Sequence, residues 1–233
     1  ALAGDFDNDG DKDLFVVNYY NAAASGNGPN RLFLNDGFGN FTDRTSDMSG
    51  NTADYWTGGT MLDIENDGDL DVVVINSENQ HTVYVNDGTA RFNTQSRGLQ
   101  NFNSSSKSYK RATAGDLDKD GFQDLVIVHK TGIDVARNDG AGQFVFAVQF
   151  PVPEAANAAT LADIDNDADL DILVGAASST SNSSRVEIFR NDGNFSFVNI
   201  SSVNSIQLDT HGILTGDWNN DGFIDMFSID QKT

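Results

Sequence analysis

Short apolar runs recur along the chain about every fifty residues. They are rich in Val, Ile and Leu and too short for helices, so they predict β-strands that are buried on both faces. Stretches of small residues, such as 56–62 and 155–161, precede them and predict innermost strands, where crowding favours Gly, Ala and Thr. The apolar runs occupy residues 14–17, 72–75, 125–128, 172–174 and 226–227.

A nine-residue acidic segment connects each small-residue stretch to the apolar run after it. The five segments align without gaps and begin at residues 5, 63, 116, 163 and 217. Acidic or amide side chains occupy positions 1, 3, 5 and 9, and glycine occupies position 6 in four of the five segments. Self-similarity at a fixed period is the mark of a repeat architecture. The chain is therefore predicted to consist of tandem repeats.

A second signature, Asn-Asp-Gly, lies between the acidic segments and begins at Asn35, Asn86, Asn138 and Asn191. Asn and Gly tolerate the positive φ of a tight hairpin. A Phe that follows each hairpin is expected to pack between neighbouring repeats, namely Phe41, Phe92, Phe144 and Phe195. Each unit then has four strands, the composition of a β-propeller blade. We expect one propeller region over residues 1–233, with repeat units at about 1–50, 51–105, 106–152, 153–206 and an incomplete 207–233.

The acidic segments have the composition of calcium loops. Calcium takes 6–8 oxygen ligands, and side chains at positions 1, 3, 5 and 9 with a backbone carbonyl at position 7 can surround one ion. Up to five calcium ions are predicted. The predicted ligands are Asp5, Asp7, Asp9, Asp11 and Asp13; Asp63, Glu65, Asp67, Asp69 and Asp71; Asp116, Asp118, Asp120, Phe122 and Asp124; Asp163, Asp165, Asp167, Asp169 and Asp171; and Asp217, Asn219, Asp221, Phe223 and Asp225.

The five loops are not equivalent. Position 6 is glycine except in the fourth loop, which has Ala168. If this position needs a positive φ, alanine costs about 1 kcal/mol there. Asn219 removes a charge from the fifth loop. An EF-hand is excluded because position 12 carries no carboxylate and strands replace its exit helix.

The composition argues against several classes of function. The net charge is −21, and 22 of the 35 acidic residues lie in the five segments. Such a charge argues against nucleic acid as a partner. The chain has no cysteine, which excludes disulfides and thiolate chemistry. No apolar stretch approaches the ~20 residues of a membrane span.

The acidic segments and the Asn-Asp-Gly-x-Gly-x-Phe sequence resemble the FG-GAP/VCBS repeats of integrin α subunits and bacterial secreted proteins. Residues 4–17 and 31–43 match especially closely. The resemblance implies a calcium-binding β-propeller, usually seven-bladed, that acts in adhesion or ligand recognition at the cell exterior. About four and a half blades are present, so we expect a longer chain or other copies to complete the ring.

No catalytic group is predicted, because His81, His129 and His211 fall at different places in their repeats and calcium ligation explains the carboxylates. The expected partner is a protein or glycan outside the cell. Two alternatives remain, a propeller domain of a secreted polysaccharide-acting enzyme and a building block of an extracellular filament. The connections 18–29 and 178–184 are candidate binding loops, and five Asn-x-Ser/Thr sequences permit N-glycosylation, at Asn40, Asn103, Asn182, Asn194 and Asn199. The candidate recognition aromatics are Tyr19, Tyr20, Tyr55 and Trp56.

Overall fold

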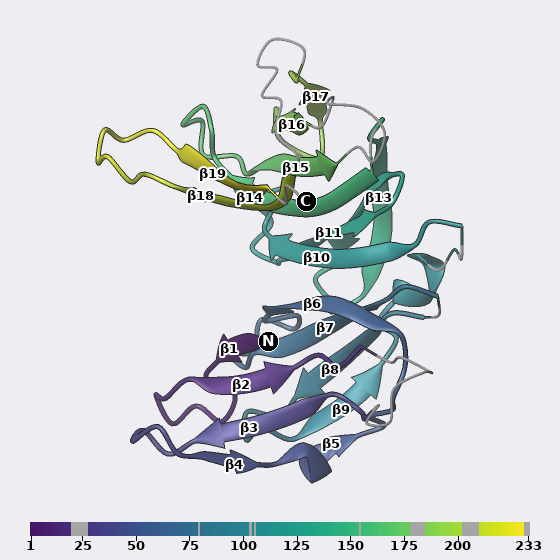
Figure 1. The fold of residues 1–233 in the computed structure, drawn as a ribbon, viewed down its shortest axis with the longest axis vertical. Coiled ribbons are helices and arrows are strands. Elements are labelled where there is room, and N and C mark those ends of the chain that lie inside the picture. The colour runs from purple at the N-terminus through teal and green to yellow at the C-terminus, as the bar shows by residue number, and fades with distance from the viewer. Residues whose placement is uncertain are drawn as a thin grey trace. The chain divides into compact units, whose positions relative to one another are not determined.

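The computed structural model describes residues 1–19, 28–78, 80–102, 104, 106–153, 155–177, 185–201 and 210–230. These residues form nineteen strands and two short 3₁₀ helices, η1 (Thr45–Asp47) and η2 (Leu99–Phe102) (Figure 1). The predicted all-β fold is confirmed. The described part of the chain contains no helix with the length and apolarity to cross a membrane. Several predictions lie outside the described residues, namely those on residues 20–27 of the first connection with Tyr20, on residues 178–184 with Asn182, on Asn103 and on the side chain of His211.

Three sheets have the predicted four strands, in chain order. The first contains β1 (Leu2–Gly4), β2 (Asp13–Val16), β3 (Arg31–Asn35) and β4 (Phe41–Asp43). Another contains β10 (Tyr109–Gly115), β11 (Asp124–His129), β12 (Gly132–Asn138) and β13 (Phe144–Pro151). A third contains β14 (Ala155–Ala162), β15 (Asp171–Ala177), β16 (Arg185–Asn191) and β17 (Phe197–Asn199).

The second sheet along the chain departs from the predicted count because it has five strands, in the order β5-β9-β8-β7-β6. The extra strand β5 pairs in parallel with β9, with Met48 opposite Phe92. The strands of this sheet are β5 (Met48–Ser49), β6 (Trp56–Leu62), β7 (Asp71–Asn76), β8 (Thr82–Asn86) and β9 (Phe92–Gln95).

As predicted, each apolar run forms the strand that follows the acidic segment, which is the second strand of every sheet except the five-stranded one, where β5 and β6 precede it. All six residues of β7 and all six of β11 are buried, which fits a strand covered on both faces. Two compact units contain these sheets. The first unit comprises Ala1–Ala112 and Asn138–Val145, and the second comprises Thr113–Arg137 and Phe146–Thr233.

Aromatic rings pack neighbouring repeats together in the first unit. Phe92 of the second repeat contacts Phe6 and Phe15 of the first edge-on, at centroid distances of 5.6 and 5.9 Å. This confirms the packing role expected for Phe92. In the fourth repeat the equivalent residue is Phe197, which begins β17 as Phe92 begins β9. Phe195 instead lies in the turn with a φ of 58°, yet it is partly buried against the core that the third and fourth repeats share, and Phe197, which the sequence analysis did not name, packs against the same core.

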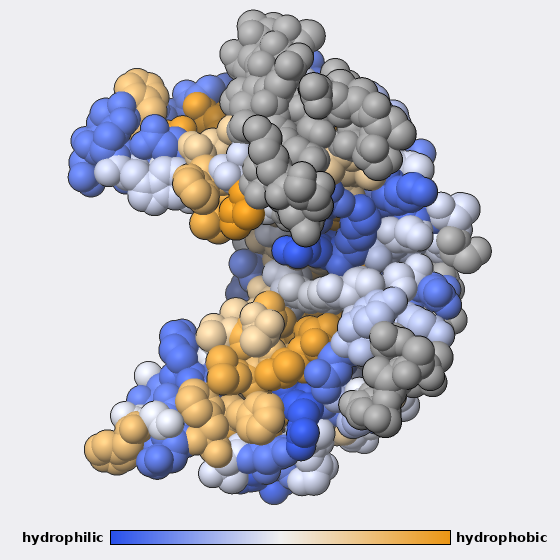
Figure 2. All heavy atoms as spheres, viewed as in Figure 1, coloured by the Kyte–Doolittle hydropathy of each residue, from blue (hydrophilic) through white to orange (hydrophobic). Residues whose placement is uncertain are grey.

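The last two strands form a hairpin, β18 (Thr210–Gly216) and β19 (Asp225–Asp230). Among the described residues β19 pairs with β18 alone, and no described strand pairs with its other edge. The expected burial of residues 226–227 is therefore incomplete, and Phe227 is 57% exposed. Figure 2 shows that the tip of this hairpin is mostly hydrophilic and that apolar residues lie farther from the tip.

Candidate metal-binding loops

Each acidic segment lies where it was predicted, in the turn between the first and second strands of its sheet. The first segment, for example, follows β1 and ends at Asp13, the first residue of β2. Short polar side chains favour such turns because they can bond nearby backbone groups.

Backbone hydrogen bonds give all five loops the same shape. In the first loop, the N–H groups of Asp9 and Gly10 donate to Oδ1 and Oδ2 of Asp5 at 3.1 and 3.0 Å. The N–H of Asp11 donates to Oδ1 of Asp9 at 2.9 Å. The equivalent bonds in the other loops span 2.8–3.2 Å. The acids at positions 1 and 5 therefore shape the loop as well as offering oxygens to a metal.

Two positions of each loop have left-handed backbone. Position 6 has a φ of 86–95° at its four glycines and 71° at Ala168, which confirms that this position needs a positive φ. Position 4 is also left-handed, with φ of 58–60° in all five loops. The sequence contained this signal, because asparagine, which tolerates that region well, stands at position 4 in four loops. The fifth position-4 residue is Lys119.

The position-9 carboxylate joins the loop to the rest of its sheet. Asp71 is buried, and it accepts hydrogen bonds from the backbone N–H groups of Ile64 at 3.0 Å and Asn86 at 2.8 Å. Asp13 and Asp171 make the same pair of contacts in their own repeats. This acid therefore ties the metal loop to the Asn-Asp-Gly hairpin.

Carboxylate oxygens of positions 1, 3 and 9 lie within 4.8 Å of one another in the first, third and fourth loops. Burial, together with the other carboxylates of the same loop, raises the pKa of four of these groups above the ordinary value, namely Asp7, Asp13, Asp118 and Asp171. Oδ1 of Asp7 is buried without a hydrogen-bond partner among the described residues. These donors fit a hard, oxygen-preferring dication such as calcium, whose charge would hold them ionised.

The second and fifth loops differ. In the second, the position-3 acid Glu65 forms an ion pair with Arg97. Burial raises the pKa of Asp71 in that loop to about 7, and the neighbouring Glu65 contributes to the shift. In the fifth, position 3 is Asn219, whose Oδ1 accepts a hydrogen bond from the N–H of Asp221 at 2.8 Å. Glu65 was predicted from the sequence as a metal ligand, and its ion pair with Arg97 was not anticipated.

In the first two loops the position-7 aspartates, Asp11 and Asp69, turn toward the hairpin of their own repeat. A Cβ added to Gly88 would lie 2.6 Å from Oδ2 of Asp69, and Gly37 faces Asp11 in the same way. The glycine of Asn-Asp-Gly is therefore required by this close approach as well as by its φ of 76° in both repeats.

The asparagine of Asn-Asp-Gly connects consecutive repeats, which the sequence did not reveal. The four asparagines do not have positive φ, so their predicted backbone role is wrong. Instead, Nδ2 of Asn86 donates to the carbonyl of Phe6 in the preceding repeat at 2.8 Å. Asn191 donates in the same way to Leu117 at 2.8 Å, and Asn138 to Ile64 at 2.9 Å.

Position-4 side chains make a second set of connections between repeats. Nδ2 of Asn8 donates to Oδ1 of Asp69 in the next repeat at 2.8 Å. Nζ of Lys119 lies 2.8 Å from Oδ1 of Asp169, and Nδ2 of Asn166 donates to the carbonyl of Gly222 at 3.2 Å. Consecutive acidic loops are therefore connected by side-chain contacts within each unit.

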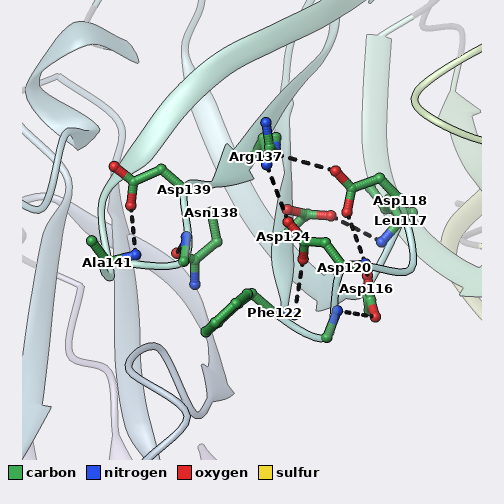
Figure 3. A network of polar contacts seen from close by, with 12 residues as sticks. Asp116, Leu117, Asp118, Asp120, Phe122, Asp124, Arg137, Asn138, Asp139 and Ala141 are labelled. Carbon is green, nitrogen blue, oxygen red and sulfur yellow. Dashed lines mark hydrogen bonds and ion pairs between the residues drawn. The ribbon is translucent and has the colours of Figure 1, made fainter.

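Arginines enter the third and fourth loops. Figure 3 shows Arg137 directed at the carboxylates of its own loop, where Nε lies 3.1 Å from Oδ2 of Asp118 and Nη2 lies 3.2 Å from Oδ2 of Asp120. In the fourth repeat, Nε of Arg190 lies 3.9 Å from Oδ2 of Asp165. Neither contact was anticipated from the sequence.

The other predicted residues lie away from these loops. His81 accepts a hydrogen bond from the N–H of Asn76 through Nδ1, and Nε2 of His129 lies 3.5 Å from Oδ1 of Asp134. Trp56 is buried and its indole N–H donates to the carbonyl of Thr52.

Tyr19 is 60% exposed and its ring meets that of Tyr55 edge-on at 6.4 Å. Of the four aromatics considered for recognition, Tyr19 is the most accessible whose side chain the structure describes.

The four-stranded sheets and the repeated acidic loops are those of a β-propeller. The sequence pattern of the FG-GAP-like repeat matches residues 5–74, 63–127, 116–174 and 176–228, and the chain belongs to this family. No curated protein matches the chain. A solved structure with a similar fold is that of an Agrocybe aegerita lectin, described as specifically recognising non-reducing terminal N-acetylglucosamine. It is 20% identical, with a TM-score of 0.60, and the match covers 97% of this chain and 58% of the lectin chain.

Proposed function

We propose that this chain is a calcium-stabilised β-propeller module for ligand recognition at the cell exterior. The observation that carries the calcium role is the convergence of three carboxylate oxygens in the first, third and fourth loops. Calcium sites of extracellular modules have dissociation constants of about 10⁻⁴–10⁻³ M, a range that suits the calcium concentration outside cells.

In this proposal, hydrogen bonds within the protein hold most of the calcium ligands in position before the ion binds. The position-1 and position-9 acids already accept backbone N–H bonds, so they hold their oxygens in place. The position-3 acid contributes the least constrained oxygen, as Asp7 illustrates with its unpartnered Oδ1. Bound calcium supplies the positive charge that offsets the mutual repulsion of these carboxylates.

A neutral saccharide is the ligand class we favour. A cavity of about 180 Å³ lies at the Trp56 end of the second sheet, and its lining contains no Asp, Glu, Lys or Arg. Hydroxyl and amide groups instead predominate, from Thr52, Thr82, Thr94, Gln80, Gln95 and Ser96. In a chain of net charge −21, such an uncharged site suits a neutral polyhydroxylated ligand. The lectin with a similar fold supports this class by analogy only.

We also propose that the module is not an enzyme. His81 and His129 are engaged in local contacts in different repeats, and the clustered carboxylates are accounted for by the repeated loop. A propeller domain of a polysaccharide-acting enzyme is the rival for the same cavity.

Two measurements test the proposal. Thermal melts with EDTA and with 5–10 times the expected Kd, about 5–10 mM calcium, should differ clearly, since metal that binds only the folded chain stabilises it. Equal melting temperatures in EDTA and in calcium would contradict the calcium role. A glycan array should show binding that Gln95→Ala and Thr94→Ala weaken, whereas release of reducing ends from a bound polysaccharide would favour the enzyme.

A further inference from the structure

Arg137 and Arg190 occupy the same place in their repeats, immediately before the asparagine of Asn-Asp-Gly. From there each side chain reaches the acidic loop of its own repeat. Arg137 contacts the position-3 and position-5 acids at 3.1 and 3.2 Å (Figure 3). Arg190 is farther from its position-3 acid, at 3.9 Å, because its Nε also lies 2.8 Å from Oδ1 of Asp192.

The first two repeats have no cation at this place. They carry Leu34 and Val85 where the third and fourth carry arginine. In the first loop the position-3 acid, Asp7, keeps a buried oxygen without a partner among the described residues. In the second loop Arg97 reaches the position-3 acid from a different part of the repeat. Among the described residues, the position-3 acid therefore has an arginine beside it in loops two to four and none in the first loop, although Oε2 of Glu65 in the second loop is also buried without a hydrogen-bond partner.

We propose that Arg137 is a built-in counter-cation of the third loop, and Arg190 a weaker one of the fourth, which stabilise these loops without metal and compete with calcium for the position-3 carboxylate. The competition rests on the calcium role proposed above. The first loop is then the site whose stability depends most on calcium.

The competition follows from the donor geometry. A guanidinium is permanently charged and its planar fork matches carboxylate oxygens. Calcium would need Oδ2 of Asp118, the atom that Nε of Arg137 contacts. The arginine must either withdraw into solvent or remain beside a dication, and both reduce the affinity. Since the Arg137 side chain is 45% exposed, we expect a moderate effect of about three- to fivefold in the calcium dissociation constant.

Site-resolved NMR separates the five loops. The position-6 amides report on each loop individually, because each donates to the position-1 carboxylate, as those of Gly10 and Gly121 do. In the wild-type protein the Gly10 amide should reach its calcium midpoint at a lower concentration than the Gly121 amide. Arg137→Leu should lower the Gly121 midpoint about three- to fivefold and leave the Gly10 midpoint unchanged.

Arg31→Leu is the matched control. It removes the same charge, but Arg31 pairs with Asp43, 2.6 Å away on β4, and not with a loop acid. This variant should leave both midpoints where they are. A shift of every amide in both variants would indicate a net-charge effect and would overturn the local competition.

Metal-free stability provides the second readout. In EDTA, Arg137→Leu should melt below the wild type, and its gain in melting temperature on adding calcium should be larger. An unchanged melt in EDTA overturns the counter-cation role. A Gly121 midpoint that stays constant or rises in Arg137→Leu overturns the competition. If no loop amide of the wild type responds to calcium, the calcium role itself fails together with the competition, whereas the EDTA melt still decides the counter-cation role.

Discussion

Replacing Asn191 with alanine tests whether the asparagine of Asn-Asp-Gly joins consecutive repeats. This side chain is fully buried, and its Nδ2 donates to the carbonyls of Leu117 at 2.8 Å and Leu170 at 3.2 Å. Leu117 belongs to the preceding repeat. Asn191→Ala removes both hydrogen bonds, which leaves one buried and one partly buried carbonyl without a donor, and it also removes the Oδ1 that accepts the N–H of Gly193 at 3.1 Å.

The expected cost follows from these contacts. Each hydrogen bond contributes about 1 kcal/mol net, and a buried acceptor that loses its donor adds a penalty of about 1–3 kcal/mol. Because the 3.2 Å bond is the weaker one, we expect a total loss of about 2–4 kcal/mol. For a chain of this size that corresponds to a fall in Tm of about 5–15 °C.

Calorimetry of Asn191→Ala beside Asn35→Ala provides the assay. Asn35 occupies the same position in the first repeat, but its Nδ2 donates to Lys12 of its own repeat at 3.2 Å in an exposed contact. Its loss should cost less than about 1 kcal/mol. Asn191→Leu fills the space without restoring a donor and should remain destabilised. If Asn191→Ala costs no more than Asn35→Ala, the connecting role is wrong.

Two further predictions concern backbone strain and pH. Ala168→Gly should stabilise the protein by up to about 1 kcal/mol, because relief of about 1–2 kcal/mol of left-handed strain exceeds the entropy that glycine adds to the unfolded chain. Gly121→Ala should destabilise the protein because of its left-handed backbone, although an added Cβ would meet nothing within 4 Å. The two substitutions should therefore change the free energy of unfolding, measured by chemical denaturation, in opposite directions. In EDTA, the protein should lose stability as pH rises from about 4 to 7. Burial raises the pKa of Asp71 to about 7 from an unfolded value near 3.9, so the folded state binds the proton more tightly than the unfolded state. The stability that this proton contributes is lost as Asp71 ionises. A melting temperature in EDTA that rises steadily over that interval would contradict this assignment, and saturating calcium should remove the decline.

The repeat made most of the fold predictable from sequence. Periodic acidic segments, apolar runs and Asn-Asp-Gly turns each occurred four or five times, so a local pattern that is ambiguous once became specific by repetition. The place of each acidic loop and the positive φ at position 6 could be predicted because they depend on residues that are neighbours in the sequence, such as the glycine at position 6.

Long-range contacts were not predictable in this way. Arg137 contacts Asp120 and Asp118, which lie 17 and 19 positions earlier in the chain. The hydrogen bond from Asn191 to Leu117 spans 74 positions. Such contacts depend on how strands align across sheets, which periodicity does not specify. Phe197 was overlooked for a simpler reason, because the fourth hairpin contains two phenylalanines and the nearer one was chosen, although Phe197 alone keeps the six-residue spacing from the asparagine that Phe41, Phe92 and Phe144 share.

The hydrogen bonds of the loops indicate what calcium can and cannot do in this fold. Both oxygens of Asp5 and both oxygens of Asp13 accept backbone N–H groups, so the loop keeps its shape through the protein alone. The repulsion among its carboxylates remains, and burial raises the pKa of Asp7 and Asp13. Calcium should therefore increase stability and rigidity without being required for folding. The metal-free chain should keep its β-sheet circular dichroism at 25 °C, and collapse of that spectrum in EDTA would show that these backbone bonds are insufficient.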